Sequence, residues 1–128
     1  GGVLAIATVF DRAEDFAHLT GALRRLEGDG SALPALPAPV YGEPCASLRA
    51  AVLARTRRVE LKNAAGEISA RSVGAYPPGS AIVAPGERFT AAAIDYLLRT
   101  KALGAALFGA EGGFVEAADK EDALDAPI

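Results

Sequence analysis

The side chains best placed for binding chemistry lie in residues 75–90, which read AYPPGSAIVAPGERFT. Proline fixes φ and removes a backbone donor, so this stretch predicts rigid corners on either side of a short apolar run. Such corners could hold Tyr76 and Glu87 at fixed positions against a ligand, and a carboxylate on a preorganised turn is a suitable receptor for an amine. The corner residues are Pro77, Pro78, Gly79, Pro85 and Gly86.

A purely structural interpretation of the same stretch is equally available. Gly79 permits a sharp turn, residues 80–84 then form a buried strand, and Pro85 with Gly86 forms a second turn. In this interpretation Glu87 only helps to begin the helix that Thr90 caps, and its contribution is a small dipole or capping effect.

The rest of the sequence excludes several kinds of site. Cys45 is the only cysteine and His18 the only histidine, so neither a disulfide nor a Cys/His metal site can form. We predict that His18 is a structural helix residue and that Cys45 packs as a small apolar residue. Gly104-x4-Gly109 is followed by Ala rather than Lys-Ser/Thr, which excludes a phosphate loop. Independent catalysis by this chain is therefore not expected.

Composition restricts the class of protein further. The chain has 128 residues, about half of them apolar, and a net charge of −3, which argues against a nucleic-acid partner. We interpret the arginine pairs 24–25 and 57–58 as solvated faces. The apolar opening, residues 1–10, is too short to span a membrane and lacks the basic region of a signal peptide. The cysteine usage favours a reducing cytoplasm, and because methionine is absent we expect a processed product or a piece of a longer protein.

The first 44 residues predict a β-α unit and a connector. Residues 3–9 form a short apolar run, typical of a strand buried on both faces. Asp11 and Glu14 have the spacing of a capping pair for an amphipathic helix at 12–27. Four prolines between residues 31 and 44 then exclude a helix or a central strand, so we interpret this segment as a Pro-rich connector and the internal boundary of the chain.

The remainder, residues 45–128, predicts short strands and helices without a repeating βαβ period, so the expected fold class is α+β with about three helices in all. Ile94, Leu97 and Leu98 should form the inner face of the helix after Thr90. The predicted elements are a helix at 45–56, short strands at 58–61, within 63–70 and at 80–84, the helix after Thr90 ending at Gly104, a small strand or hairpin arm at 107–108 and 114–115, and a frayed acidic tail at 116–125.

Three segments resemble those of one protein family. YPPGSAIVAPGERFT, residues 76–90, is similar to the YPPG-(I)-P-x-x-x-PGE-x-(I/V)-T signature in the C-terminal region of the bacterial Orn/Lys/Arg decarboxylases. RRVELKNAAGEISAR, residues 57–71, resembles the V-x-L-x-x-A-x-G-(R)-I-(S)-A segment of that family. LAIATVFDRAEDFAHLTGALRRL, residues 4–26, is similar to a strand and helix of its small domain. The resemblance spans most of the chain in the family's order.

The resemblance implies a part of a pyridoxal-phosphate (PLP) enzyme of the aspartate-aminotransferase fold type, active in polyamine metabolism. Residues 1–30 would belong to the small domain and residues 45–128 to the C-terminal domain. This portion would help to form the substrate entrance and subunit contacts of a homo-oligomer, with the PLP-binding domain of the same parent chain as its partner. Glu87 is then the candidate for attracting the distal cationic group of the substrate, with Tyr76 beside the entrance.

The sequence also departs from the family in two respects. Ser80 and Ala81 follow the YPPG motif where the family usually carries an apolar residue and a proline. The family's cofactor lysine follows a histidine, whereas Lys62, Lys101 and Lys120, the only lysines here, do not. We therefore expect no cofactor in this chain and PLP in the parent enzyme. The alternatives are a stand-alone, non-catalytic interaction or regulatory module derived from that domain, and an unrelated small-molecule binding domain.

Overall fold

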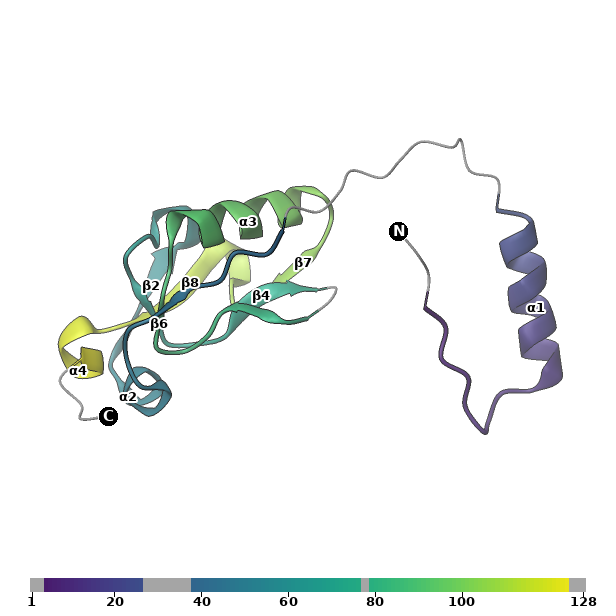
Figure 1. Ribbon diagram of the computed structural model, residues 1–128, viewed down its shortest axis with the longest axis horizontal. Coiled ribbons are helices and arrows are strands. Elements are labelled where there is room, and N and C mark those ends of the chain that lie inside the picture. Colours follow the sequence, from purple (N-terminus) through teal and green to yellow (C-terminus); the bar gives the residue numbers. More distant parts are fainter. Residues whose placement is uncertain (1–3, 27–37, 77–78, 125–128) are drawn as a thin grey trace. The chain divides into compact units, whose positions relative to one another are not determined.

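The computed structural model describes residues 4–26, 38–76 and 79–124 and divides the chain into two units, Gly1–Ala35 and Leu36–Ile128 (Figure 1). The second unit contains both β-sheets and three of the four α-helices. This mixture of antiparallel sheets and helices confirms the predicted α+β class. No helix within the described residues has the length and apolarity needed to cross a membrane.

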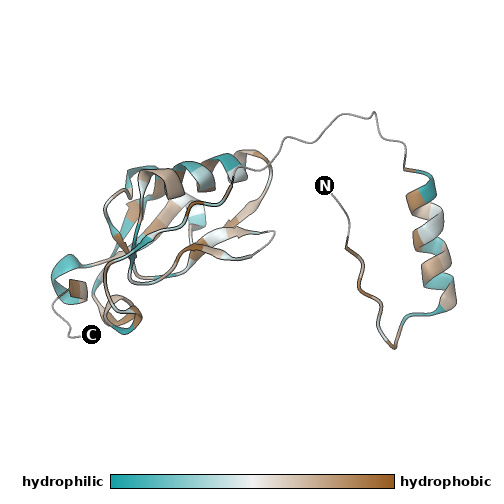
Figure 2. Ribbon diagram, viewed as in Figure 1, coloured by the Kyte–Doolittle hydropathy of each residue, from teal (hydrophilic) through white to brown (hydrophobic). Residues whose placement is uncertain are grey.

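The first unit contains one helix, α1, Ala13–Arg24, which carries both apolar and polar residues and buries none of them (Figure 2). The predicted capping pair is wrong by one residue: the Arg12 backbone N–H donates to the Asp15 carboxylate at 2.8 Å, while Asp11 accepts from the Thr8 N–H. His18 lies exposed on α1.

The strand predicted at residues 3–9 is not formed in the described residues 4–8, which have no regular secondary structure. A strand must pair its backbone donors and acceptors with a neighbouring strand. The described part of this unit contains no second strand to pair with. An apolar run is therefore not sufficient here to form a strand.

The larger sheet has five antiparallel strands in the order β1-β6-β3-β8-β2. Its longest pairing joins β2 and β8, with Val59 opposite Val115. The strands are β1 Glu43–Pro44, β6 Glu87–Arg88, β3 Ile68–Ser69, β8 Phe114–Ala118 and β2 Thr56–Glu60.

The smaller sheet has three antiparallel strands in the order β5-β4-β7, namely β5 Ala81–Val83, β4 Val73–Tyr76 and β7 Ala106–Phe108. The strand predicted at 80–84 is β5, and its last two residues are buried. The segments predicted as a small strand or hairpin arm, 107–108 and 114–115, both lie in strands. They do not form a hairpin with each other, because β7 pairs with β4 while β8 pairs with β2 and β3. The two segments are close in sequence but lie in different sheets.

Side chains cap two of the helices, and the cap at Thr90 is the one predicted from the sequence. The Ser47 side chain accepts from the Ala50 N–H before α2, Leu48–Leu53, and the Thr90 side chain accepts from the Ala93 N–H before α3, Ala91–Ala102. The prediction for the inner face of α3 is wrong at Leu98, which is 39% exposed, because Tyr96 takes the buried position instead.

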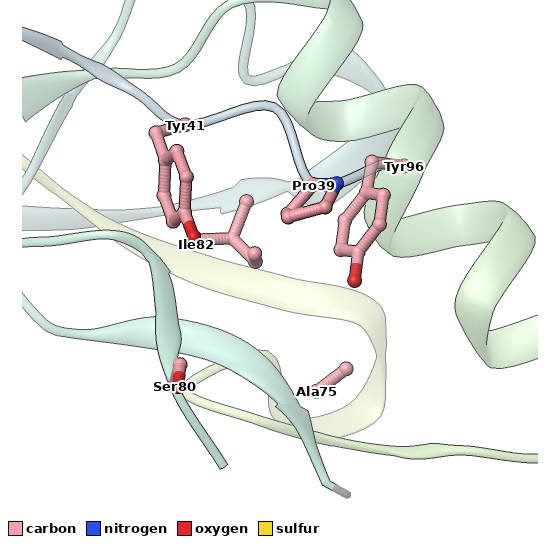
Figure 3. Close-up of a pocket in the computed structure, with 6 residues that line it drawn as sticks. All are labelled: Pro39, Tyr41, Ala75, Ser80, Ile82 and Tyr96. Carbon is pink, nitrogen blue, oxygen red and sulfur yellow. The ribbon is translucent and has the colours of Figure 1, made fainter. Parts of the chain in front are cut away.

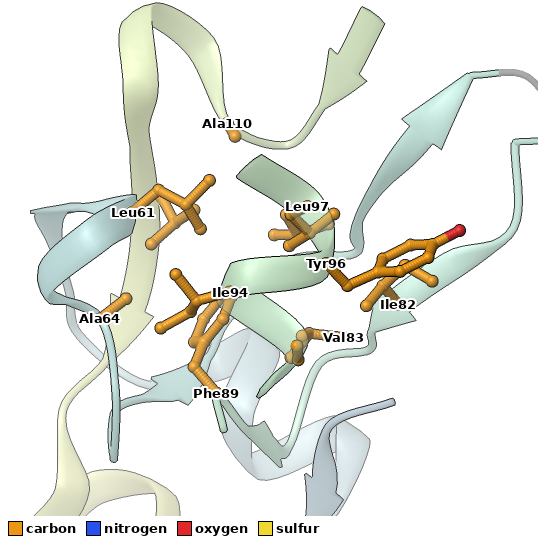
Figure 4. Close-up of a cluster of buried hydrophobic side chains, with 12 residues drawn as sticks. Leu61, Ala64, Ile82, Val83, Phe89, Ile94, Tyr96, Leu97 and Ala110 are labelled. Atoms are coloured by element: carbon orange, nitrogen blue, oxygen red, sulfur yellow. The ribbon is translucent and has the colours of Figure 1, made fainter. Parts of the chain in front are cut away.

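The core of the second unit lies between α3 and the two sheets (Figure 4). Phe89 and Leu97 are the largest fully buried side chains of the main cluster of this core. A second cluster contains the fully buried Ile68 together with Ala51 of α2 and Ala123. The main cluster comprises Leu61, Ala64, Val73, Ile82, Val83, Phe89, Ala93, Ile94, Tyr96, Leu97, Ala110 and Val115.

The acidic tail predicted to fray at 116–125 is ordered through residue 124. It completes β8 and then forms α4, Lys120–Leu124, which packs with α2 at one end of the unit (Figure 1). Arg55 fixes α4 in place, because its backbone N–H and its guanidinium Nε both donate to Asp122 at 2.9 Å. The prediction of a frayed tail is wrong because Ala117, Ala118 and Ala123 are buried and Arg55 pairs with Asp122. These contacts outweigh the tendency of the acidic side chains to remain in solvent.

We expect Asp122→Asn to lower the melting temperature Tm at pH 7 by up to roughly 4 °C. Arg55 lowers the pKa of Asp122 below its ordinary value, chiefly by hydrogen bonding. A carboxyl group with a lowered pKa in the folded state stabilises that state at pH values above the ordinary carboxyl pKa. This stabilisation is lost as pH falls through the pKa of the folded state. The Tm difference between wild type and variant should therefore shrink as pH falls below the ordinary carboxyl pKa. Thermal melts between pH 7 and pH 2 measure it, and an unchanged difference at low pH would contradict this role.

Candidate functional site

Glu87 belongs to a tight turn of the PGE motif. The Glu87 N–H donates to the Ala84 carbonyl at 3.0 Å, and Gly86 in the third position of the turn has φ +86°. The half-buried Glu87 side chain folds back onto the turn, where Oε2 accepts from the Ala84 N–H at 2.8 Å. One carboxylate oxygen of the candidate amine receptor is thus engaged by its own turn.

Gly86 connects this turn to two other segments of the chain. Its N–H donates to the Ser69 carbonyl at 2.9 Å, and its carbonyl accepts from the N–H groups of Cys45 and Ala46 at 3.0 and 2.9 Å. The thiol of Cys45 also lies 3.3 Å from this oxygen. A β-carbon at Gly86 would lie 2.5 Å from the Ala46 carbonyl oxygen, so the site accepts no side chain.

The YPPG corner lies at the end of the β4–β5 hairpin. Gly79 has φ +91°, and its N–H donates to the Ala75 carbonyl at 2.9 Å. Tyr76 is 66% exposed, and its ring packs 3.2 Å from the position that a Gly79 β-carbon would take. Pro77 and Pro78 lie outside the described residues.

The structure does not bring the two sequence-predicted site residues into one pocket. Glu87 lies in the five-stranded sheet and Tyr76 in the three-stranded sheet. Neither side chain lines the two pockets described below. Their proposed part in a substrate entrance therefore depends on what the rest of a parent protein adds.

A small pocket lies instead beside Ser80 and Ala75 (Figure 3). Ala75 and Tyr76 are successive residues of β4, so their side chains point to opposite faces of the strand. It has a volume of about 80 Å³. The Gly42 N–H donates to the Ile82 carbonyl at 2.9 Å and holds the preceding segment against β5. The lining residues are Pro39, Tyr41, Ala75, Ser80, Ile82 and Tyr96.

Sequence reasoning missed this pocket. Ile82 was expected in a strand, but the strand that contains Ala75 was not predicted. Pro39 and Tyr41 belong to the segment interpreted as a connector, and nothing local indicates that it returns to β5. Tyr96 offered one signal, because this aromatic residue lies next to Leu97 on the helix whose inner face was assigned to aliphatic residues alone.

A second, more open pocket of about 440 Å³ lies around Arg71 and is polar. The Arg71 Nε lies 2.7 Å from Glu116 Oε2, and this hydrogen bond raises the pKa of Arg71. Ser72, Gly109 and Glu111 complete its lining. Arg71 and Glu116 neutralise each other, so Glu111 leaves the described residues of this lining with one net negative charge and no free cation. Within the described residues there is no group of three or more histidine, cysteine or acidic side chains that could hold a metal ion.

Comparison with known proteins gives one family and a group of solved structures. Residues 31–115 match the family described as "Orn/Lys/Arg decarboxylase, C-terminal domain". The constitutive lysine decarboxylase of E. coli is similar in structure, with a TM-score of 0.51 and 22% identity over 62% of this chain and 14% of that chain. The lysine decarboxylase LdcF of Francisella novicida has a TM-score of 0.46 and 23% identity over 56% of this chain and 12% of that chain. A search of curated proteins found no match.

These structures extend far beyond the segment that resembles this chain, which spans about a seventh of the length of the E. coli enzyme. At this level of identity the likeness concerns the fold alone. The family match begins within the Pro-rich segment and includes both the YPPG and the PGE turns.

We expect Gly86→Ala to destabilise the chain by at least about 2 kcal/mol, because it adds backbone strain to a clash with Ala46. Gly66→Ala is the matched control: Gly66 also has positive φ, but a β-carbon there meets nothing within 4 Å. This control should cost about 1 kcal/mol from strain alone. Denaturant unfolding of both variants measures the difference. Equal losses of stability would show that the close approach at Gly86 does not matter.

Proposed function

Since the chain belongs to the family of Orn/Lys/Arg decarboxylase C-terminal domains, we propose that it is the C-terminal portion of a larger, cytoplasmic PLP-dependent decarboxylase of basic amino acids. In that enzyme it shapes the substrate entrance and contributes subunit contacts, and it does not catalyse alone. The match over residues 31–115 carries the proposal, and it confirms the resemblance drawn from the YPPG and PGE motifs.

Exposed apolar side chains support a role in contacts with the rest of the parent. Leu48, Val52 and Leu53 of α2 are all at least half exposed, which is unusual for three apolar residues on one short helix. A domain that normally packs against a larger partner would cover such a surface. The homo-oligomer of the parent and the PLP-binding domain as neighbour are parts of the same proposal.

The residues of this chain do not fit a PLP site, because such enzymes bind the cofactor covalently through a lysine. Lys62 and Lys120 are exposed and pair with Glu60 and Glu67 at 2.8 and 3.7 Å. Lys101 is exposed in the last turn of α3. None of the three lines either pocket described above. We therefore assign the cofactor to another part of the parent chain and derive no catalytic step here.

The test compares the parent protein with the isolated chain. We expect the parent to decarboxylate at least one of ornithine, lysine and arginine, and the 128-residue chain to be inactive and to show no borohydride-fixed PLP on a lysine. Deleting residues 36–128 from the parent should abolish activity and change its oligomeric state. An inactive parent that lacks a cofactor lysine would overturn the proposal in favour of a non-catalytic module. A parent whose activity and assembly survive the deletion would remove the proposed entrance and contact roles.

The geometry supports a turn-holding role for Glu87 over amine recognition, because Oε2 already accepts from the Ala84 N–H. Glutamine retains an acceptor oxygen but no charge, so Glu87→Gln in the parent should leave kcat/KM within about twofold of wild type. Glu87→Ala, which removes the acceptor, should cost roughly 1 kcal/mol of stability.

A substrate-binding carboxylate would behave differently. Loss of a charge-assisted contact costs roughly 1.5–3 kcal/mol, about ten- to a hundredfold in kcat/KM. Steady-state kinetics on all three basic amino acids, with Tm measured alongside, separate the two roles. A large fall in kcat/KM for the glutamine variant at unchanged Tm would restore Glu87 as the amine receptor at the entrance.

A further inference from the structure

The pocket beside Ser80 has a volume that selects among ligands by shape. An apolar cavity of about 150 Å³ accommodates a benzene ring. At about 80 Å³ this pocket is too small for an aromatic ring but has room for a short unbranched alkyl chain. The ligand can project beyond it, because the pocket opens to solvent at one side, where Tyr41 is 56% exposed.

The lining combines apolar walls with hydroxyl groups. Pro39 and Ile82 and the rings of Tyr41 and Tyr96 offer contacts to methylene groups, whereas the hydroxyls of the two tyrosines and Ser80 can donate or accept hydrogen bonds. Both phenolic oxygens point toward the hairpin side of the pocket, where Ser80 lies (Figure 3). Each hydroxyl can therefore act on a polar group at the end of a bound chain.

The electrostatics of the lining favour an amine over an acid as that polar end. The described residues that line the pocket include no basic and no acidic side chain, so the hydroxyls and the tyrosine rings decide between a carboxylate and an ammonium group. Hydroxyl oxygens accept from an ammonium group, and the faces of tyrosine rings attract it. An ammonium at the open side keeps part of its hydration, as long charged side chains do at protein surfaces.

Ser80 lines the pocket with a short side chain and adds a third hydroxyl to it.

We propose that this pocket binds a linear aliphatic amine, with the methylene chain against Pro39, Ile82 and the tyrosine rings and the ammonium group at the hydroxyls. The choice of ligand rests on the proposed function, because loss of CO2 from ornithine or lysine leaves a linear diamine. The pocket would then be a binding site for the product of that class of reaction.

The test is a titration of the isotopically labelled 128-residue chain with 1,5-diaminopentane, monitored by the NMR signals of the Ala75 and Ile82 methyl groups. We expect saturable shifts with a dissociation constant on the order of millimolar. 1,5-Pentanediol, which has the same chain without charge, should bind at least about fivefold more weakly. tert-Butylamine, which is charged but branched, should give no saturable shift. Absence of saturation with the diamine, or equal shifts with tert-butylamine, would overturn the proposal.

Variants locate the site. Ser80→Ile fills the pocket and should weaken binding at least about tenfold, whereas Ser80→Ala leaves it open and should bind within about threefold of wild type. The matched control is Ser72→Ile, at an exposed serine outside this pocket, which should bind as wild type does. If Ser80→Ile fails to fold, Ala75→Val narrows the pocket from another side and should weaken binding similarly. If Ser80→Ile or Ala75→Val folds and binds the diamine as tightly as wild type does, the proposed location of the site is wrong.

The binding experiment requires no decarboxylation, so the two proposals fail separately. Loss of the amine site with an active parent would leave the proposed function intact. Amine binding by this chain together with an inactive parent would overturn the proposed function alone, and the pocket would then be an amine site in a non-catalytic protein.

Discussion

The close approach of the Gly86 backbone to the chain before α2 is the contact on which the second unit depends. A single residue, Gly86, joins the turn before β6 to β3 through its N–H and to Cys45 and Ala46 through its carbonyl. Only a residue without a side chain fits, since the Ala46 oxygen occupies the place of a β-carbon. The β1–β6 edge of the larger sheet and the start of α2 both follow from this one position.

The same segment transmits order from one sheet to the other. Immediately after β6, Phe89 enters the core and is almost completely buried, and its N–H donates to the backbone carbonyl of Glu67 at 2.9 Å. Thr90 then caps α3, whose buried residues contact the strands of the smaller sheet. The turn, the buried phenylalanine and the cap follow one another within five residues, so the position of α3, and of Tyr96 on it, is set by the turn at Gly86.

Local signals in the sequence were sufficient to predict the structure wherever the residues that determine it are close together in the chain. The Thr90 cap, the glycine at position 104 with φ +97° and the Pro85–Gly86 turn are all formed as predicted. The failures lie where a partner is far along the chain. The acidic composition after residue 116 is typical of a solvated tail, and the sequence does not indicate that Arg55 lies beside it. The pocket beside Ser80 forms only because a segment some forty residues earlier packs against β5. No pattern within either segment contains that information.

The position of β8 has a consequence for how the protein is made. This strand is the last of the eight to leave the ribosome, yet it lies between β2 and β3 and joins β2 to the rest of the larger sheet. Its partner Thr56–Glu60 is synthesised long before and must wait with its edge unpaired, a state that is open to wrong pairing. Pairing across so much intervening sequence is also slow. The chain therefore acquires its complete larger sheet only after β8 has been synthesised, and a nascent chain stopped before residue 114 cannot form it.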